Sequence, residues 1–146
     1  MKSHRPRLVT PAPSATPSGK GLFWLGATGY GTTGWTSALT GMIGFWSTEN
    51  WTDTANGTEM RFFTAANGTN ARAERIRITE NGNVGIGTTA PTQMLDVNSN
   101  GLRIRNAKTP ASSGAACNQG EMAWDSNYVY VCVLTNTWRR ATLALW

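Results

Sequence analysis

The sequence predicts an all-β protein built from short strands and turns. Three observations favour this class. Apolar and polar residues alternate in several short runs, as in RAERIRIT, where Ile76 and Ile78 fall on one face and Arg75 and Arg77 on the other. Asn-Gly pairs at residues 67–68 and 81–82 separate such runs, and this pair is a strong hairpin signal. No segment shows a convincing helical periodicity.

The apolar content is low for a chain of 146 residues that folds alone. Glycine contributes 16 residues, and the alternating runs have narrow apolar faces. Such a chain packs poorly by itself or buries its strands against copies of itself. Seven Trp add apolar area, but most of them lie beside Gly or Thr, so we interpret them as interface or surface residues as often as core residues.

Residues 1–20 differ from the rest of the chain. They hold four of the six Pro residues and a charge of +4 without an acidic residue. We expect an extended Pro-rich arm, which is either a solvated tail or a peptide that threads into the surface of a partner. No apolar stretch approaches the ~18 residues of a membrane span, and a secretory signal is lacking, so we expect synthesis in the cytoplasm and no membrane partner.

The remaining chain divides into three parts. Residues 21–106 alternate strand-like runs with turns and predict a β-rich body, residues 107–120 predict a linker, and residues 121–146 predict a small C-terminal β cap. The expected strands of the body cover residues 21–25, 42–46, 58–65, 72–79, 83–88, 93–97 and 102–106, and those of the cap cover residues 121–125, 128–134 and 138–145.

Cys117 and Cys132 are the two cysteines of the chain, and the single histidine, His4, lies in the arm. The cysteines are either a pair of structural thiols or a disulfide. Neither cysteine has the further Cys or His neighbours that a metal site needs, and a catalytic thiol would need a base. We therefore expect no metal, no cofactor and no catalytic residue.

The stretch GATGYGTTGW, residues 26–35, matches the glycine pattern of a dinucleotide-binding loop. Strand-like runs flank it, and Glu49 lies where a ribose-binding acid would be expected after Gly29. However, only WTSALT separates Gly34 from Gly41, which is far too short for a crossover helix. Without a helix N-terminus the pyrophosphate has no binding site, so we interpret the stretch as a tight turn.

The run ITENGNVGIGTTAPTQMLDVNSNGLRIR, residues 78–105, resembles a motif that recurs in bacteriophage tail-fibre and tailspike-like proteins. The last residues, AACNQGEMAWDSNYVYVCVLTNTWRRATLALW, are similar to C-terminal modules of phage structural proteins, and the resemblance covers residues 21–146. It implies an intertwined homotrimeric fibre with a short β shaft, a small C-terminal cap and an N-terminal arm. Three copies around an axis would close a core that is too thin for one chain, whereas a monomeric sandwich is the alternative.

The resemblance also implies roles for particular residues. Gly85 and Gly87 would leave one strand face bare for another backbone, and Pro91 would set the chain direction after this strand. The Gly-rich turn at residues 26–35 would lie where the three chains meet. The implied trimer core consists of Val84, Ile86, Leu95, Val97, Leu102 and Ile104. The implied virion anchor consists of Arg5, Arg7, Leu8 and Val9. The expected receptor-facing residues are Trp124, Tyr128, Tyr130 and Trp138, and packing inside the cap is the alternative for each of them.

The function implied by the resemblance is that of a virion structural protein, a short trimeric tail fibre that the arm attaches to other virion proteins and that contacts a host glycan or protein. The alternative is a capsid decoration protein without a receptor role. An enzyme is not expected, because glycan hydrolysis uses paired carboxylates and the eight acidic residues are scattered. The basic stripes of residues 75–78 and 102–105 are interleaved with acids, which favours paired strand faces over nucleic-acid binding.

Overall fold

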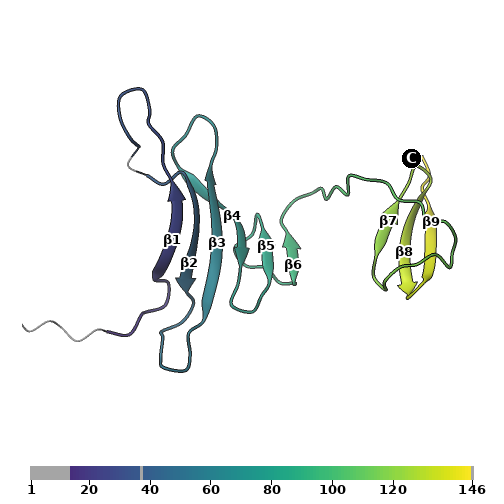
Figure 1. The fold of residues 1–146 in the computed structure, drawn as a ribbon, viewed down its shortest axis with the longest axis horizontal. Helices are drawn as coiled ribbons and strands as arrows, with labels where there is room; N and C mark the ends of the chain where they lie inside the picture. The colour runs from purple at the N-terminus through teal and green to yellow at the C-terminus, as the bar shows by residue number, and fades with distance from the viewer. Residues whose placement is uncertain (1–13, 37, 146) are drawn as a thin grey trace, which may run out of the picture. The chain divides into compact units, whose positions relative to one another are not determined.

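The computed structural model describes residues 14–36 and 38–145, which fold into two compact units, and the chain passes from the first unit to the second between Asn100 and Gly101. Each unit contains one β-sheet, and the described residues contain no helix, which confirms the predicted all-β class (Figure 1). Consequently, no helix within this part of the chain is long and apolar enough to cross a membrane. The proposed anchor residues Arg5, Arg7, Leu8 and Val9 lie outside the described residues.

The first unit is a six-stranded sheet whose strands follow one another in sequence order. Each strand is antiparallel to the next except for the last pair, which is parallel. The predicted strands of this region are thus confirmed up to residue 97, because alternating runs joined by turns form such a meander. The strands are β1 (Gly21–Ala27), β2 (Gly41–Ser47), β3 (Thr58–Ala65), β4 (Arg72–Ile78), β5 (Val84–Ile86) and β6 (Leu95–Val97).

The parallel pair β5–β6 is joined by a loop of residues 87–94 rather than by a helix. The loop turns back over Gly85, where an added Cβ would lie 2.6 Å from the carbonyl oxygen of Thr88 and 3.4 Å from Pro91. Gly87 has a φ of 73°, which favours glycine because a side chain is strained in this left-handed conformation. The bare strand face at Gly85 therefore accommodates a loop of the same chain, and this loop covers one side of the sheet.

The described end of the N-terminal arm is bound to the sheet. Ser47, at the end of β2, is only 1 % exposed, and its hydroxyl donates to the carbonyl of Pro17 at 2.6 Å. The backbone N–H of Gly19 donates to the carbonyl of Ser47 at 2.8 Å, and that of Trp51 donates to the carbonyl of Thr16 at 2.8 Å. The arm was predicted to extend to residue 20, but its last residues belong to the body because these hydrogen bonds hold them.

The second unit contains a three-stranded antiparallel sheet of β7 (Met122–Trp124), β8 (Tyr128–Leu134) and β9 (Thr137–Thr142). All three strands of the predicted cap are present. The predicted linker of residues 107–120 is wrong, because this segment is part of the unit. It is held by a disulfide between Cys117 and Cys132 and by a 2.8 Å hydrogen bond from the backbone N–H of Trp138 to the carbonyl of Ser113. The disulfide decides between the two alternatives that the sequence left open.

The predicted strand at residues 102–106 does not form. Leu102 is 79 % exposed and Ile104 is 47 % exposed in the single chain. Their assignment to the trimer core stays a prediction. The carbonyl of Ile104 accepts a 2.8 Å hydrogen bond from the indole of Trp124. Alternation of apolar and polar residues is thus not sufficient for a strand, because a strand also needs a neighbouring edge with which to pair.

Candidate functional site

The first unit carries an apolar face that crosses all six strands. Residues directly opposite each other in neighbouring strands lie on the same side of a sheet, so the strand register identifies the side of every residue. Two rows of cross-strand partners on one side consist entirely of large apolar side chains. The first row is Leu25, Ile43, Phe62, Ile76, Ile86 and Val97, and the second is Phe23, Phe45, Met60, Ile78, Val84 and Leu95. We call these twelve residues the apolar face.

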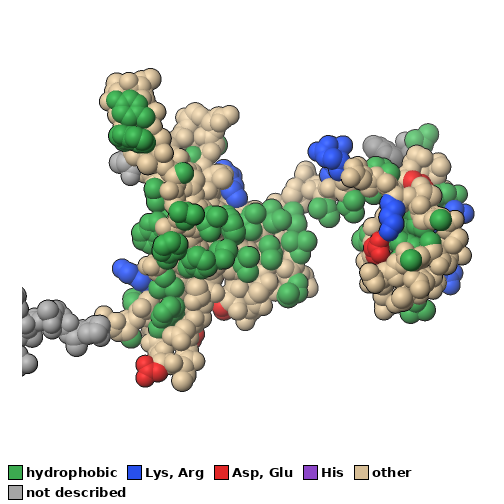
Figure 2. Space-filling view, in the orientation of Figure 1, with side chains coloured by type: hydrophobic (Ala, Val, Ile, Leu, Met, Phe, Trp, Pro, Cys, Tyr) green, Lys and Arg blue, Asp and Glu red, His purple; other side chains and the backbone are tan. Residues whose placement is uncertain are grey.

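None of the twelve residues is buried in the chain. The exposed fraction reaches 61 % at Phe23 and 69 % at Leu25 on β1, and 59 % at Leu95 on β6. Figure 2 shows green side chains gathered into a continuous patch over the strands of this unit. Proteins that remain monomeric rarely expose an apolar patch that spans a whole sheet, so this face is the strongest candidate for an interaction site in the first unit.

Much of the opposite side of the sheet is covered by its own residues. The ring of Trp46 lies over Gly44, where an added Cβ would come within 2.7 Å of the indole. The Arg61 guanidinium stacks on this indole at 4.7 Å from the ring centre, and Phe63 packs against it with ring centres 5.6 Å apart. Together with the loop over Gly85, these contacts cover much of the second side from β2 to β5, whereas the apolar face is open across the sheet.

A charged cluster lies on this second side. Glu59 is 5 % exposed and accepts hydrogen bonds from Arg61 and, at 2.9 Å, from Arg77. Arg77 also donates to Glu74 at 2.7 Å, and this hydrogen bond is the main reason why the pKa of Arg77 is raised above its usual value. Two carboxylates and two guanidinium groups therefore neutralise each other, as the paired-face interpretation of the Arg-Ile alternation predicts.

The second unit has a different chemistry, because its sheet buries aromatic residues. Tyr130 and Trp138 are each 5 % exposed and pack edge to face, with ring centres 6.5 Å apart, beside the fully buried Cys132. Tyr128 and Trp124 are partly exposed. For Tyr130 and Trp138 the alternative of packing inside the cap holds and the receptor-facing assignment is wrong, since both share the inner side of the sheet with the disulfide. Receptor binding by this unit stays a prediction, with Trp124 and Tyr128 as its accessible aromatic residues.

Asp125 orders the turn between β7 and β8. Its carboxylate accepts hydrogen bonds from the backbone N–H groups of Asn127 at 2.8 Å and Tyr128 at 2.9 Å, from the hydroxyl of Tyr130 at 2.5 Å, and from that of Thr109 at 2.9 Å. These bonds, that of Tyr130 most strongly, lower the pKa of Asp125 to about 2. With four hydrogen bonds accepted, the Asp125 carboxylate has a structural role in the turn.

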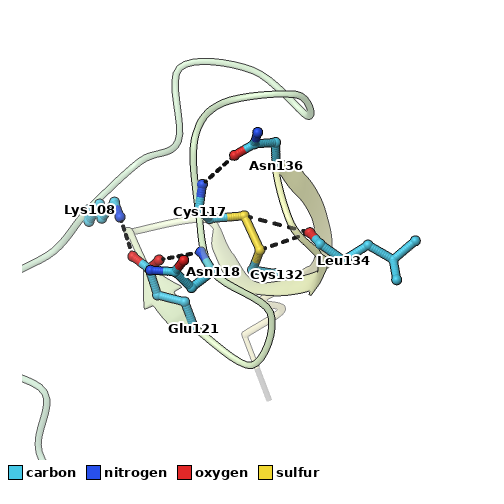
Figure 3. The surroundings of a disulfide bond; sticks show 7 residues. All are labelled: Lys108, Cys117, Asn118, Glu121, Cys132, Leu134 and Asn136. Atoms are coloured by element: carbon cyan, nitrogen blue, oxygen red, sulfur yellow. Dashed lines mark hydrogen bonds and ion pairs between the residues drawn. A yellow bond between two sulfur atoms is a disulfide. The ribbon is translucent and has the colours of Figure 1, made fainter.

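The disulfide region of the second unit is shown in Figure 3. Cys117 and Asn136 form two reciprocal hydrogen bonds, each 3.1 Å long, between the backbone N–H of one residue and an oxygen of the other. Glu121 accepts a 2.5 Å hydrogen bond from the Lys108 ammonium, and this bond is the main reason why the pKa of Glu121 is lowered. Within the described residues, no group of three or more His, Cys, Asp or Glu residues is arranged to hold a metal ion.

No protein-family model matches the chain. A 40-residue segment, 27 % of the chain, is 48 % identical to depolymerase 1, capsule K30/K69-specific, of Klebsiella phage K5-2. The carboxy-terminal domain of the L-shaped tail fibre of bacteriophage T5 superposes on 90 % of this chain and on 78 % of its own, with a TM-score of 0.49 and 12 % identity. Over that segment the chain resembles a bacteriophage protein.

The segment match confirms that the chain is similar to bacteriophage proteins, as the sequence predicts. The matched segment spans only 5 % of the length of the Klebsiella phage depolymerase, so the activity and the capsule specificity in that protein's name belong to that protein.

One third of the apolar face was predicted from the sequence as part of an assembly core, and the other residues were not. Val84, Ile86, Leu95 and Val97 were assigned to an assembly core, and all four lie on the face. The strands β1 to β4 contribute the other eight residues. A signal for them exists in the sequence, because apolar residues recur at every second position in residues 23–25, 43–45, 60–62 and 76–78. What the sequence does not show is that all four runs face the same side.

Proposed function

We propose that this chain is a subunit of a short bacteriophage tail fibre, and that three copies assemble by covering the apolar face. The observation that carries the proposal is the double row of twelve apolar side chains, none of which is buried within one chain. The match to a bacteriophage protein supports the virion role. Three copies are what the resemblance of residues 78–105 to a fibre motif implies.

The free energy of assembly would come from the burial of these side chains. Fully burying a Leu, Ile, Val or Phe side chain contributes roughly 1.5–3 kcal/mol. Leu25, Phe23 and Leu95 retain well over half of their surface in the single chain, so each has most of this contribution still to gain. The apolar face contains no charged side chain whose desolvation would oppose assembly.

We further propose that the basic arm attaches the fibre to other virion proteins and that the second unit contacts the host surface. The arm leaves the body at a defined point, since its end is bound to Ser47. The hydrogen bonds at Ser47 would transmit a force on the anchored arm to strand β2. The proposal includes no catalytic step, because the carboxylates of Glu59 and Glu74 are bound to guanidinium groups.

The test is the mass of the purified protein in solution. Light scattering during size-exclusion chromatography should give three times the 15.8 kDa chain mass for the wild type. Leu95→Glu places a charge on the apolar face and should shift the mass toward that of one chain. Met94→Glu is the matched control, because Met94 is 69 % exposed, directly precedes Leu95 and lies outside the two rows.

A monomeric wild type would overturn the proposed assembly, and so would equal effects of Leu95→Glu and Met94→Glu. A stable dimer would retain the apolar face as the interface but contradict the fibre symmetry. Circular dichroism of each variant separates loss of assembly from loss of folding, because the monomer formed by Leu95→Glu should keep its strand signal. Imaging of the virion with a labelled chain then tests the tail attachment against a position on the capsid.

A further inference from the structure

We propose that the tip of the β1–β2 hairpin is a binding site for a neutral polysaccharide, with Tyr30 and Trp35 as the stacking platform. This inference goes beyond the proposed fibre assembly and does not depend on it. The site is formed by the Gly-rich stretch that resembles a dinucleotide-binding loop in sequence, residues 26–35.

The hairpin between β1 and β2 continues well beyond the sheet (Figure 1). Its two arms are joined by backbone hydrogen bonds from Thr40 to Ala27 and from Thr36 to Gly29, both 3.0 Å long. At the tip the N–H of Gly31 donates to the carbonyl of Gly34 at 2.7 Å. These bonds hold the backbone of the tip in one geometry, so a binding surface on it is formed before the ligand arrives.

Tyr30 and Trp35 face each other across this tip and form an isolated β-bridge. Their rings are perpendicular, with centres 5.7 Å apart. Tyr30 is 65 % exposed and Trp35 is 70 % exposed, which is unusual for side chains of this size. In a perpendicular pair only one face of one ring is covered by its partner, so the remaining faces are open to a flat ligand.

The glycines around the Tyr30–Trp35 pair are a second, independent indication that a ligand can approach the tip. A Cβ added at Gly29 or Gly34 would meet no atom within 4 Å, and neither residue has a positive φ. The fold of the chain therefore does not require glycine at these positions. Glycine also occurs where another molecule approaches the backbone closely. The absence of side chains beside two open rings leaves the backbone of the tip accessible to a bound ligand.

The chemistry of the tip selects the class of ligand. No charged residue occurs between residues 21 and 48, so the tip offers no ionic partner to an anionic or cationic ligand. A charged side chain contacts the hairpin near its base, where Arg72 donates to the carbonyl of Leu39 at 3.2 Å. Thr28, Thr32, Thr33 and Thr36 lie in the same loop, and the hydroxyls of Thr28 and Thr36 hydrogen-bond to each other. Aromatic faces beside neutral hydroxyl and amide groups match a pyranose ring, which has an apolar face and a hydroxyl rim.

The size of the tip argues against a protein partner. A stable protein interface buries about 800 Å² on each partner, and fewer than a handful of side chains at a hairpin tip cannot supply this area. A sugar unit is about as large as one aromatic ring, so the two rings accommodate one or two units of a chain. Repetition of the same unit along a polysaccharide, and of the tip in an assembly, would then raise the affinity.

The test is affinity electrophoresis of the full chain in gels that contain dextran, laminarin or galactomannan. The wild type should be retarded by at least one of these neutral polymers, and Trp35→Ala should raise the dissociation constant at least tenfold. Trp24→Ala is the matched control, because Trp24 is 50 % exposed on β1 and lies away from the tip. Gly34→Ala should weaken binding without changing the unfolding midpoint, whereas Gly114→Ala, which is equally open in the single chain, should change neither.

Absence of retardation in all three gels would overturn the inference, as would equal losses in Trp35→Ala and Trp24→Ala. A change of solution mass in Trp35→Ala or Gly34→Ala would show that the tip contacts another copy, which also contradicts it. An alginate gel separates stacking from charge attraction, because retardation by alginate should vanish with added salt and be insensitive to Trp35→Ala. The mass measurement reports on the fibre proposal separately, so either proposal can fail alone.

Discussion

The hydroxyl of Tyr130 lies 2.5 Å from the carboxylate of Asp125 and donates a hydrogen bond to it across the turn between β7 and β8. The bond raises the pKa of Tyr130 and lowers that of Asp125 to about 2, because it favours the protonated phenol and the ionised acid together. The pair connects the aromatic core of the second unit to its turn.

The stability of the second unit should therefore depend on pH through Asp125. A lowered pKa contributes stability above the usual value of 3.8, and this contribution is lost as the pH falls toward about 2. Asp125→Asn should lower the melting temperature at pH 7, and the difference from the wild type should shrink below pH 3.8. Asp53→Asn, on an exposed turn, is the control. A pH-independent difference would contradict the assignment.

Removing the disulfide should destabilise the second unit. In the chain-entropy model, a loop of about 15 residues closed by a disulfide contributes about 3 kcal/mol. Cys117→Ala combined with Cys132→Ala should lower the free energy of unfolding by roughly this amount, because Cys132 is completely buried in the core. Denaturant unfolding followed by tryptophan fluorescence measures it. An unchanged transition in the double variant would show that the hydrogen bonds of Cys117 to Asn136 suffice.

Breaking the charged cluster should destabilise the first unit. Glu59→Gln leaves Arg77, whose side chain is 15 % exposed, with one carboxylate instead of two. Loss of one partner from a buried ion pair costs roughly 3 kcal/mol. Urea unfolding should show this loss of stability. Glu80 is exposed, so the unfolding midpoint of Glu80→Gln should remain close to that of the wild type. Equal midpoints for the two variants would mean that Glu74 alone satisfies Arg77.

A single methyl group at Gly85 should be costly. Its position 2.6 Å from the carbonyl oxygen of Thr88 forces the backbone of the β5–β6 loop to move. Overpacking of this kind typically costs 1–3 kcal/mol, so Gly85→Ala should lower the unfolding midpoint. Gly114→Ala provides the control, because nothing lies within 4 Å of its Cβ. If both variants unfold alike, the loop is not packed on the strand.

The local pattern of the sequence was sufficient for most strands but not for all of them. Alternation placed Ile76 and Ile78 opposite Arg77 correctly, because the two sides of a strand follow directly from its two-residue period. The same pattern failed at Leu102 and Ile104, since no edge pairs with that segment. The linker prediction failed for a related reason, because a Ser- and Gly-rich segment can pack as irregular chain once a disulfide holds it.

The sequence by itself determined the all-β class, the Asn-Gly turns and the presence of short apolar runs, because these depend on neighbours within a few residues. Only the tertiary structure decided which side of the sheet each run occupies, whether the two cysteines are bonded, and that Tyr130 and Trp138 lie inside while Tyr30 and Trp35 lie outside. The physical reason is that exposure depends on strand register and on contacts between distant segments. The open apolar face and the open hairpin tip are products of that register.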